Sequence, residues 1–164
     1  MKRLFLIRHA KSSWSDPDLR DFERPLNKRG KRDAPVMGAR LARHKVNPDL
    51  ILSSPARRAF KTAKIMASEI GCPIKNIQTH KAIYLADVPT LMDVLRKIDS
   101  ACETVFLFGH NPGLTMLANY LTNYCVDNIP TCGIFCIDFE IASWREVSQG
   151  NGRVTFFDYP KKHL

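Results

Sequence analysis

Three short apolar runs, each ending abruptly in polar residues, constrain the fold of this chain more than any other feature. They cover residues 4–7, 50–52 and 105–108, and the polar residues that follow them are Arg8-His9, Ser53-Ser54 and Gly109-His110. Apolar runs of this length with sharp ends are typical of buried strands. Segments with helical spacing separate the runs, so we predict alternating strands and helices around a mostly parallel sheet.

The remaining elements follow from periodicity and from helix and turn signals. Asn27 is a suitable N-cap for a helix from residue 28, and Pro55 opens a second helix that closes near Gly71. We expect further helices at residues 88–98 and 114–121, an extended segment at 77–85, and an antiparallel hairpin of strands 133–139 and 153–158 at one end of the sheet. The predicted fold class is therefore α/β.

The length and hydropathy of the chain indicate one ordinary globular domain. The 164 residues are 45% hydrophobic, which suffices for one substantial core, and we expect residues 1–164 to form a single domain and a monomer. No apolar run approaches the ~20 residues of a membrane-spanning helix, and the apolar segment after Met1 is too short for a signal peptide. We therefore expect a cytoplasmic protein that does not bind a membrane.

The net charge of +9 and the pI near 9.5 favour acidic partners, which are phosphorylated molecules, acidic proteins or nucleic acid. Basic clusters at residues 40–45 and 161–163 lack interleaved aromatic residues that could stack on bases, so we expect solvated faces there and no nucleic-acid partner. The five cysteines are odd in number and lack paired metal-ligand spacing. This pattern predicts reduced structural thiols. The chain also has no HExxH, EF-hand or Walker A motif, so we expect no metal and no other cofactor.

The polar residues at the strand ends converge if the strands are parallel. Parallel strands bring their carboxyl ends to one edge of the sheet, which is where open α/β sheets bind ligands. His9, His110 and the arginines after Ser54 would then share one site. A long loop at residues 12–27 adds acids and bases that either line the rim of this site or are simply solvated. These are Asp16, Asp18, Arg20, Asp21, Glu23 and Arg24.

Three motifs, in this order, resemble those of the histidine phosphatase superfamily, which includes the cofactor-dependent phosphoglycerate mutases. They are Arg8-His9-Ala10, Ser54-Pro55-x-x-Arg58-Ala59-x-x-Thr62-Ala63 and Gly109-His110-Asn111-Pro112. The small size and the segment Pro25-Leu26-x-x-x-Gly30 are similar to the SixA-type phosphohistidine phosphatase branch. The resemblance implies a three-layer, phosphoglycerate mutase-like fold with helices on both faces of the sheet. Ala10 stands where most of the superfamily has glycine, and we expect little disturbance from it.

The resemblance makes His9 the nucleophile that accepts the phosphoryl group, and it makes Arg8, Arg58 and His110 the other members of the phosphate pocket. Arg57 is the alternative to Arg58, but it lies about 100° around the helix and does not match the motif. The chemistry agrees, because a neutral imidazole can attack phosphorus and hold the group covalently. Arginine presents a fork that matches phosphate oxygens. A protonated His110 would add another donor.

The identity of the proton donor stays open. Mutases and ester phosphatases of the superfamily use an acid from the segment before the third helix, and Asp87 is the acid available there. Asp87 also fits a surface role or a helix-capping role. An N-phosphorylated histidine is a good leaving group once protonated, so it has less need of a dedicated acid.

These features predict a metal-independent phosphatase that works through a phosphohistidine enzyme intermediate and acts on protein phosphohistidine. Two alternatives stay open: a phosphatase of small phosphate esters in the same superfamily, and a non-catalytic basic domain that binds phosphorylated ligands. The sequence does not name the physiological substrate. Selectivity would lie in the loop at residues 12–27 and around Asp87.

Overall fold

The computed structural model describes residues 1–163, and within them the chain forms one sheet of six strands in the order β3-β2-β4-β1-β5-β6. The strands are β1 (Lys2–Arg8), β2 (Leu50–Ser53), β3 (Ile77–Thr79), β4 (Thr104–Gly109), β5 (Ile134–Phe139) and β6 (Gly152–Asp158). Neighbours among β3, β2, β4 and β1 pair in parallel, whereas β5 pairs antiparallel with both β1 and β6. The predicted mostly parallel sheet with a terminal antiparallel hairpin is confirmed.

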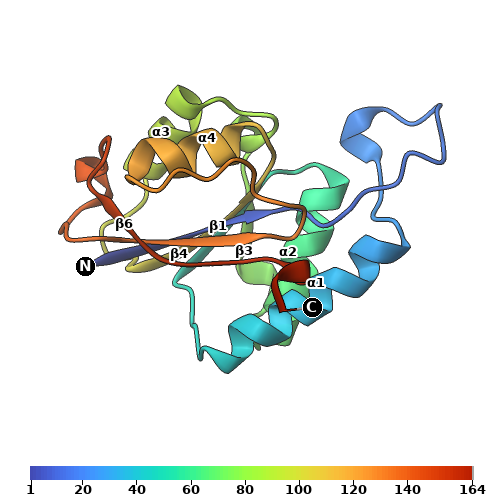
Figure 1. Ribbon diagram of the computed structural model, residues 1–164, viewed down its shortest axis with the longest axis horizontal. Coiled ribbons are helices and arrows are strands. Elements are labelled where there is room, and N and C mark those ends of the chain that lie inside the picture. The colour runs from blue at the N-terminus through green and yellow to red at the C-terminus, as the bar shows by residue number, and fades with distance from the viewer. Residues whose placement is uncertain (164) are drawn as a thin grey trace.

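Helices lie on both faces of this sheet. Helices α1 (Lys28–Arg43) and α2 (Arg57–Glu69) cover one face, and α3 (Val88–Arg96) and α4 (Gly113–Leu121) cover the other (Figure 1). Short 3-10 turns are η1 (Asp21–Glu23), η2 (Ile74–Asn76), η3 (Lys81–Ile83), η4 (Trp144–Glu146) and η5 (Pro160–His163). The arrangement is the α/β class predicted from the residues, with the three layers that the family resemblance implies. Within residues 1–163, no helix is both long enough and apolar enough to span a membrane.

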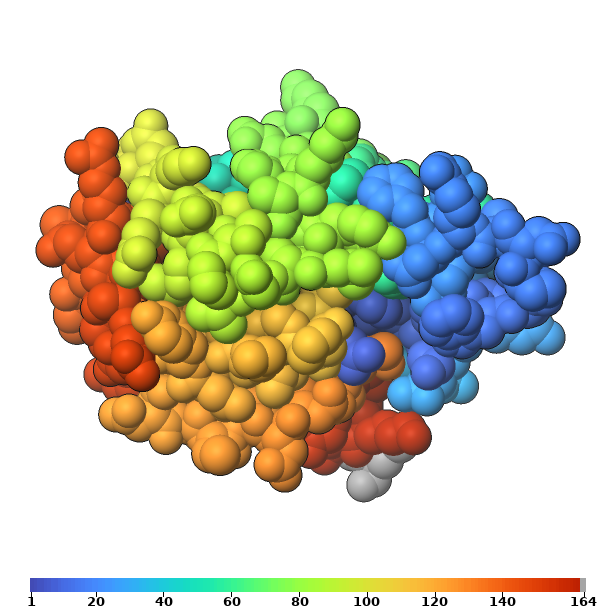
Figure 2. Space-filling view, turned by 90° about the horizontal axis from the view of Figure 1, so that it is seen from above, coloured from blue at the N-terminus to red at the C-terminus, as the bar shows by residue number. Residues whose placement is uncertain are grey.

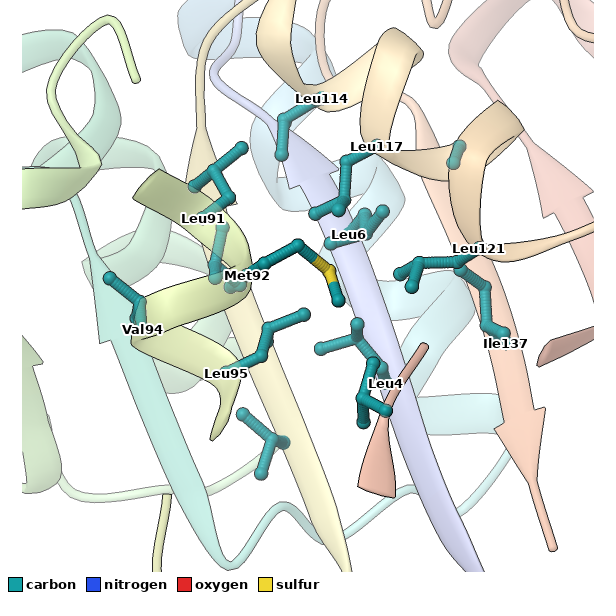
Figure 3. Close-up of a cluster of buried hydrophobic side chains, with 14 of the residues drawn as sticks. Leu4, Leu6, Leu91, Met92, Val94, Leu95, Leu114, Leu117, Leu121 and Ile137 are labelled. Carbon is teal, nitrogen blue, oxygen red and sulfur yellow. The ribbon is translucent and has the colours of Figure 1, made fainter. Parts of the chain in front are cut away.

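Side chains that alternate along β1 divide between the two layers of helices. Leu4 and Leu6 are fully buried and meet leucines of α3 and α4 (Figure 3). Phe5 and Ile7 are fully buried in the cluster on the opposite face, which includes Met37 of α1. Each leucine removed from water in this way stabilises the fold by about 2 kcal/mol. Packing from both sides therefore fixes β1, and with it the position of the residues that follow.

The start of α1 closes the base of the loop at residues 12–27, which projects at one end of the molecule (Figures 1 and 2). Asn27 Oδ1 accepts a hydrogen bond from the Gly30 N–H at 2.9 Å, so Asn27 is the N-cap that the sequence predicts. The Asn27 N–H donates to the Lys11 carbonyl oxygen at 3.0 Å. A Cβ at Gly30 would lie 2.2 Å from that oxygen, so this close approach requires glycine. The loop therefore leaves and rejoins the protein beside the end of β1.

The segment between β3 and α3 differs from its prediction. Only residues 77–79 are extended, because the His80 side chain accepts a hydrogen bond from the Ala82 N–H at 3.2 Å and begins the η3 turn. The side-chain hydrogen bond of His80 therefore ends the strand and starts a turn, although residues 80–85 have the pattern of an extended segment. The turn matters for function because Tyr84 follows it and lies beside His110.

Candidate active site

The carboxyl ends of β1, β2 and β4 meet at one edge of the sheet, as the sequence predicts. Backbone hydrogen bonds continue the strand pairing there: His9 N–H donates to the Gly109 carbonyl at 3.2 Å, and Ser54 N–H donates to the Phe108 carbonyl at 3.0 Å. The ring centroids of His9 and His110 lie 5.2 Å apart, and both side chains are buried. The strand-end pocket is the name used below for Arg8, His9, Arg58 and His110.

His9 is held as a neutral imidazole with one nitrogen facing Arg58. Its Nδ1 lies 2.8 Å from the carbonyl oxygen of Ala10, which can only accept, so Nδ1 carries the proton and Nε2 keeps a lone pair. Arg58 Nε lies 3.4 Å from this Nε2. Burial lowers the pKa of His9 to about 4; the Ala10 contact raises it, and the charges of Arg58 and Arg8 lower it further. His9 is therefore unprotonated at neutral pH.

Arg58 joins the two histidines to the loop at residues 12–27. Its Nη2 lies 3.3 Å from His110 Nδ1 and donates to Asp21 Oδ2 at 2.9 Å, while its Nη1 donates to the Asp21 carbonyl oxygen at 2.7 Å. Arg58 is only 3% exposed, whereas Arg57 is exposed. Of the two neighbouring arginines, the one that matches the motif is the one beside His9.

Thr62 ties the first turns of α2 to the end of β1. Its hydroxyl accepts from the Ala10 N–H at 2.9 Å and donates to the Arg58 carbonyl oxygen at 2.7 Å. Thr62 appears in the motif quoted from the sequence, but only the structure gives it this role. Ala10 has an ordinary negative φ among the described residues, so its methyl group causes no backbone strain, as expected.

Arg8 occupies the last position of β1 and has donor capacity to spare. Its Nη1 donates to the Ile129 carbonyl at 3.0 Å, but its Nε is buried without a hydrogen-bond partner among residues 1–163. Burial and the nearby charge of Arg58 lower the pKa of Arg8. Asn111 Nδ2 donates to the same Ile129 carbonyl at 2.9 Å. A residue of the third motif therefore shares the backbone acceptor that holds Arg8. An anion in this pocket would relieve both the unpaired donor and the crowding of positive charge.

His110 is a neutral imidazole in the free protein. A protonated His110, the further donor to phosphate considered from the sequence, is not the form present before a ligand binds. Arg58 can only donate to Nδ1, which leaves the proton on Nε2, 2.7 Å from the Ser54 hydroxyl. Burial and the neighbouring His9 and Arg58 lower the pKa of His110 to about 3. Ser54 also accepts from the Ala56 N–H at 3.2 Å, so one hydroxyl both orients His110 and caps the turn before α2.

Asp21 is the site residue that the sequence did not single out. Its carboxylate lies 2.9 Å from Arg58 Nη2, 3.0 Å from Arg24 Nη1 and 2.5 Å from the Tyr84 hydroxyl. Burial raises the pKa of Asp21, but these hydrogen bonds outweigh burial and lower it to about 2. The sequence predicts that the loop's charged residues either line the rim of the site or are solvated. Asp21 lines the rim. Its only signal in the sequence, an acid in a long loop, is shared with its acidic neighbours.

Asp87 is the N-cap of α3. Its carboxylate accepts from the Thr90 N–H at 3.0 Å, and the side chain is exposed. Hydrogen bonds with Thr90 lower the pKa of Asp87. The carboxyl group is therefore ionised at neutral pH, which is the opposite of what a proton donor needs. The capping role left open by the sequence is the one that the structure supports.

The pocket is built to receive an anion. Within residues 1–163, no three His, Cys, Asp or Glu side chains gather as a possible metal site. The fixed charges around His9 are instead the guanidinium groups of Arg8 and Arg58, which match the oxygens of phosphate. A neutral nucleophile between such groups can attack a bound phosphoryl group and stabilise the negative charge that it carries.

Sequence comparisons find a family and relatives. Residues 4–83 match the profile of the histidine phosphatase superfamily (branch 1). The chain is 33% identical over 153 residues to the uncharacterized chloroplastic protein At3g52155 of Arabidopsis thaliana, with 88% of this chain and 70% of the relative covered. It is 28% identical over 165 residues to the uncharacterized protein Rv1276c of Mycobacterium tuberculosis, with 94% of this chain and all (100%) of the relative covered.

Solved structures share the fold over nearly the whole chain. One is a protein of Agrobacterium tumefaciens provisionally assigned as the phosphohistidine phosphatase SixA; it is 27% identical, with a TM-score of 0.81 over 97% of this chain and 98% of that one. Another is the protein histidine phosphatase SixA complexed with tungstate, with a TM-score of 0.84 over 99% of each chain. At 20% identity, this second similarity concerns the fold alone.

Proposed function

This chain belongs to the histidine phosphatase superfamily, and from that premise we propose that it is a metal-independent phosphatase that carries the phosphoryl group on His9 and acts on phosphohistidine in proteins. One observation carries the proposal. His9 is a neutral imidazole whose Nε2 lone pair faces buried Arg58, beside an Arg8 whose Nε has no hydrogen-bond partner among the described residues.

In the first step, His9 Nε2 attacks phosphorus as the bond from phosphorus to the leaving group breaks. The Nδ1–H bond to the Ala10 carbonyl keeps the ring in the tautomer that this attack requires, and it stabilises the positive charge that develops on the ring. The low pKa of His9 keeps the nucleophile unprotonated at neutral pH. Covalent transfer to His9 divides one difficult hydrolysis into two easier steps.

Arg8 and Arg58 bind the oxygens of the phosphoryl group in both steps. Phosphoryl transfer depends mainly on positioning and on charge stabilisation, and the buried Arg58 and the half-buried Arg8 would provide both. Asp21 holds Arg58 through its carboxylate and its backbone carbonyl, so it acts as a positioning residue. His110 is oriented by Ser54, its ring centroid lies 5.2 Å from that of His9, and it completes the pocket as a neutral imidazole.

In the second step, water attacks phosphorus as the bond to His9 Nε2 breaks, a proton of that water passes to solvent, and inorganic phosphate leaves while His9 returns to its neutral form. The leaving group of the first step needs a dedicated acid in the protein only when it cannot easily take a proton from solvent. A phosphohistidine substrate releases an imidazole, which leaves readily once it has taken a proton from solvent. The proposal therefore assigns no proton to Asp87, whose carboxylate caps α3.

Two kinds of observation support a protein substrate. The segments that flank the pocket expose large apolar side chains: Trp14 is 73% exposed, Leu85 56% and Phe22 36%. The Phe22 ring centroid lies 5.1 Å from that of Tyr84, the chain neighbour of Leu85, and exposed apolar groups that gather beside a pocket are typical of surfaces that contact other proteins. Of the two similar structures described above, one is provisionally assigned as a phosphohistidine phosphatase and the other is a protein histidine phosphatase.

The test follows phosphate release from a histidine-phosphorylated peptide and from p-nitrophenyl phosphate. We expect His9→Ala to lower turnover of both by about 10⁴-fold or more, as removal of a nucleophile does in other enzymes. Rapid quenching should trap an acid-labile, alkali-stable phosphoenzyme in the wild type and none in the variant. His44→Ala is the matched control, because His44 is exposed at the end of α1.

Undiminished turnover in His9→Ala would overturn the covalent mechanism. EDTA should leave the wild-type rate unchanged, and a loss that added divalent metal restores would overturn metal independence. A wild type that binds phosphorylated ligands but never turns them over would favour the non-catalytic alternative.

A further inference from the structure

A basic groove lies along α2, outside the strand-end pocket. It has a volume of about 540 Å³. Its cations are Lys31, Arg57, Lys61 and Lys64, and its apolar walls include Pro55 and Phe60. Among the described residues that line it there is no acid. The mechanism proposed above makes no use of these cations, although they lie close to the reacting groups in the chain.

The basic groove is lined by residues that neighbour those of the strand-end pocket in the chain. Pro55 directly follows Ser54, whose hydroxyl lies 2.7 Å from His110 Nε2. Arg57 directly precedes Arg58 on α2, and consecutive residues of a helix point about 100° apart. Arg58 therefore serves the pocket while Arg57 serves the groove. This adjacency would allow a chain whose phosphorylated residue occupies the pocket to continue into the groove.

The spacing of the charges suits an extended acidic chain. Arg57, Lys61 and Lys64 stand at helix positions i, i+4 and i+7, so they share one face over roughly 10 Å. In an extended peptide, side chains on the same side recur about every 6.6 Å, so two or three carboxylates on alternate residues would span this row. The apolar walls would accept the aliphatic parts of the residues between them.

The same features argue against a compact phosphate site. Lys31 and Lys61 are exposed point charges on flexible stems and present no fixed fork of donors. Lys64 Nζ lies 4.8 Å from the centre of the Phe60 ring, on a surface that is only half-buried. Such charges attract a line of carboxylates better than they define one tetrahedral group.

We propose that the basic groove binds an acidic segment of the phosphoprotein substrate, adjacent in its sequence to the phosphohistidine, an inference that rests on the proposed phosphohistidine phosphatase activity. The groove would then decide which phosphoproteins are dephosphorylated, while the strand-end pocket carries out the same reaction on all of them. Opposite charges on the two partners would also speed their encounter.

Binding can be measured without catalysis. A fluorescein-labelled peptide of alternating alanine and glutamate is titrated with the protein at low salt, and anisotropy reports binding. We expect the double variant Lys61→Glu, Lys64→Glu to weaken binding by about tenfold or more, since each reversal removes an attraction and adds a repulsion. The control is Lys75→Glu, Lys97→Glu, which makes the same charge change at exposed positions outside the groove. Equal weakening by the two double variants would overturn the proposal.

Catalysis gives the second test. Phosphohistidine peptides carry four glutamates or four glutamines on one side or the other of the phosphorylated residue. We expect one of the two glutamate peptides, the one whose acidic side enters the basic groove, to have a higher kcat/KM than its glutamine counterpart. The double variant Lys61→Glu, Lys64→Glu should lose this preference and should still hydrolyse p-nitrophenyl phosphate at the wild-type rate. Equal losses on p-nitrophenyl phosphate would mean that the groove acts on the phosphoryl group, and would overturn docking.

Failure of the proposed phosphatase activity and failure of peptide binding by the groove would give different results. A wild type that hydrolyses no phosphohistidine peptide would overturn the proposed function, and the anisotropy titration would still decide whether the groove binds an acidic chain. The milder pair Lys61→Gln, Lys64→Gln should give an intermediate loss of peptide binding, and circular dichroism checks that each variant is folded.

Discussion

The strand-end pocket and the basic groove flank the first turn of α2 and use positive charge in opposite ways. In the pocket, Arg58 is buried and donates to fixed partners on His110 and Asp21. In the groove, Arg57 and Lys61 are exposed to solvent. Charges act strongly in a buried, low-dielectric site, whereas exposed charges are screened by water and salt. One region is therefore suited to stabilising a transition state, and the other to attracting a partner.

Replacing each of the two neighbouring arginines by lysine tests most directly whether the pocket and the groove use positive charge differently. We expect Arg58→Lys to lower kcat/KM for p-nitrophenyl phosphate by about 10³-fold, because lysine keeps the charge but loses the fork that holds phosphate oxygens. Arg57→Lys should change it by less than about threefold, as expected of an exposed charge. Steady-state kinetics of the two variants at several salt concentrations provides the measurement. Similar losses in both would mean that the two regions are not distinct.

The acid titration of His9 sharpens the comparison further. In the folded protein, the pKa of His9 is lowered to about 4 from an ordinary value of 6.5, so the imidazole stays unprotonated until the pH falls near 4. The unfolded chain takes up this proton near 6.5, so the free energy of unfolding should fall as the pH drops from 6.5 toward 4. Proton NMR of the His9 ring gives the pKa directly.

The same titration separates the two arginines. Arg58→Gln should raise the pKa of His9, because loss of a nearby positive charge favours the imidazolium form. Arg57→Gln should leave the pKa of His9 unchanged. A wild-type midpoint near 6.5 would contradict the buried, cation-lined environment of His9.

The smallest effect is expected at Asp21, which links the loop at residues 12–27 to the pocket. Asp21→Asn removes the charged partner of Arg58, and we expect kcat to fall by about tenfold, the value of one hydrogen bond to a charged group. Asp16→Asn, which alters an exposed acid of the same loop, should have no effect. Thermal unfolding of both variants checks stability. A loss of kcat that follows only a loss of stability would contradict a positioning role.

Much of the pocket could be predicted because its residues are carried by short local signals. Arg8 and His9 end an apolar run, and His110 ends another, so strand polarity alone brings them to one edge. Arg58 was distinguishable from Arg57 because it matches the position of the arginine in the family motif, and the angle of about 100° between consecutive helix residues means that only one of the two can face the phosphate. Asp21 and Tyr84 could not be chosen in this way. Their roles depend on where a loop and a 3-10 turn come to rest, and no periodicity governs either.

The sequence by itself determined where most strands and helices lie along the chain, the N-cap at Asn27 and the residues of the three motifs, because each of these is set by the pattern of residues near one another in the chain. The tertiary structure alone decided that Asp21 holds Arg58, that Asp87 caps α3, and that both pocket histidines are neutral. Protonation and pairing depend on burial and on charges brought together from distant segments, and burial exists only once the chain has folded.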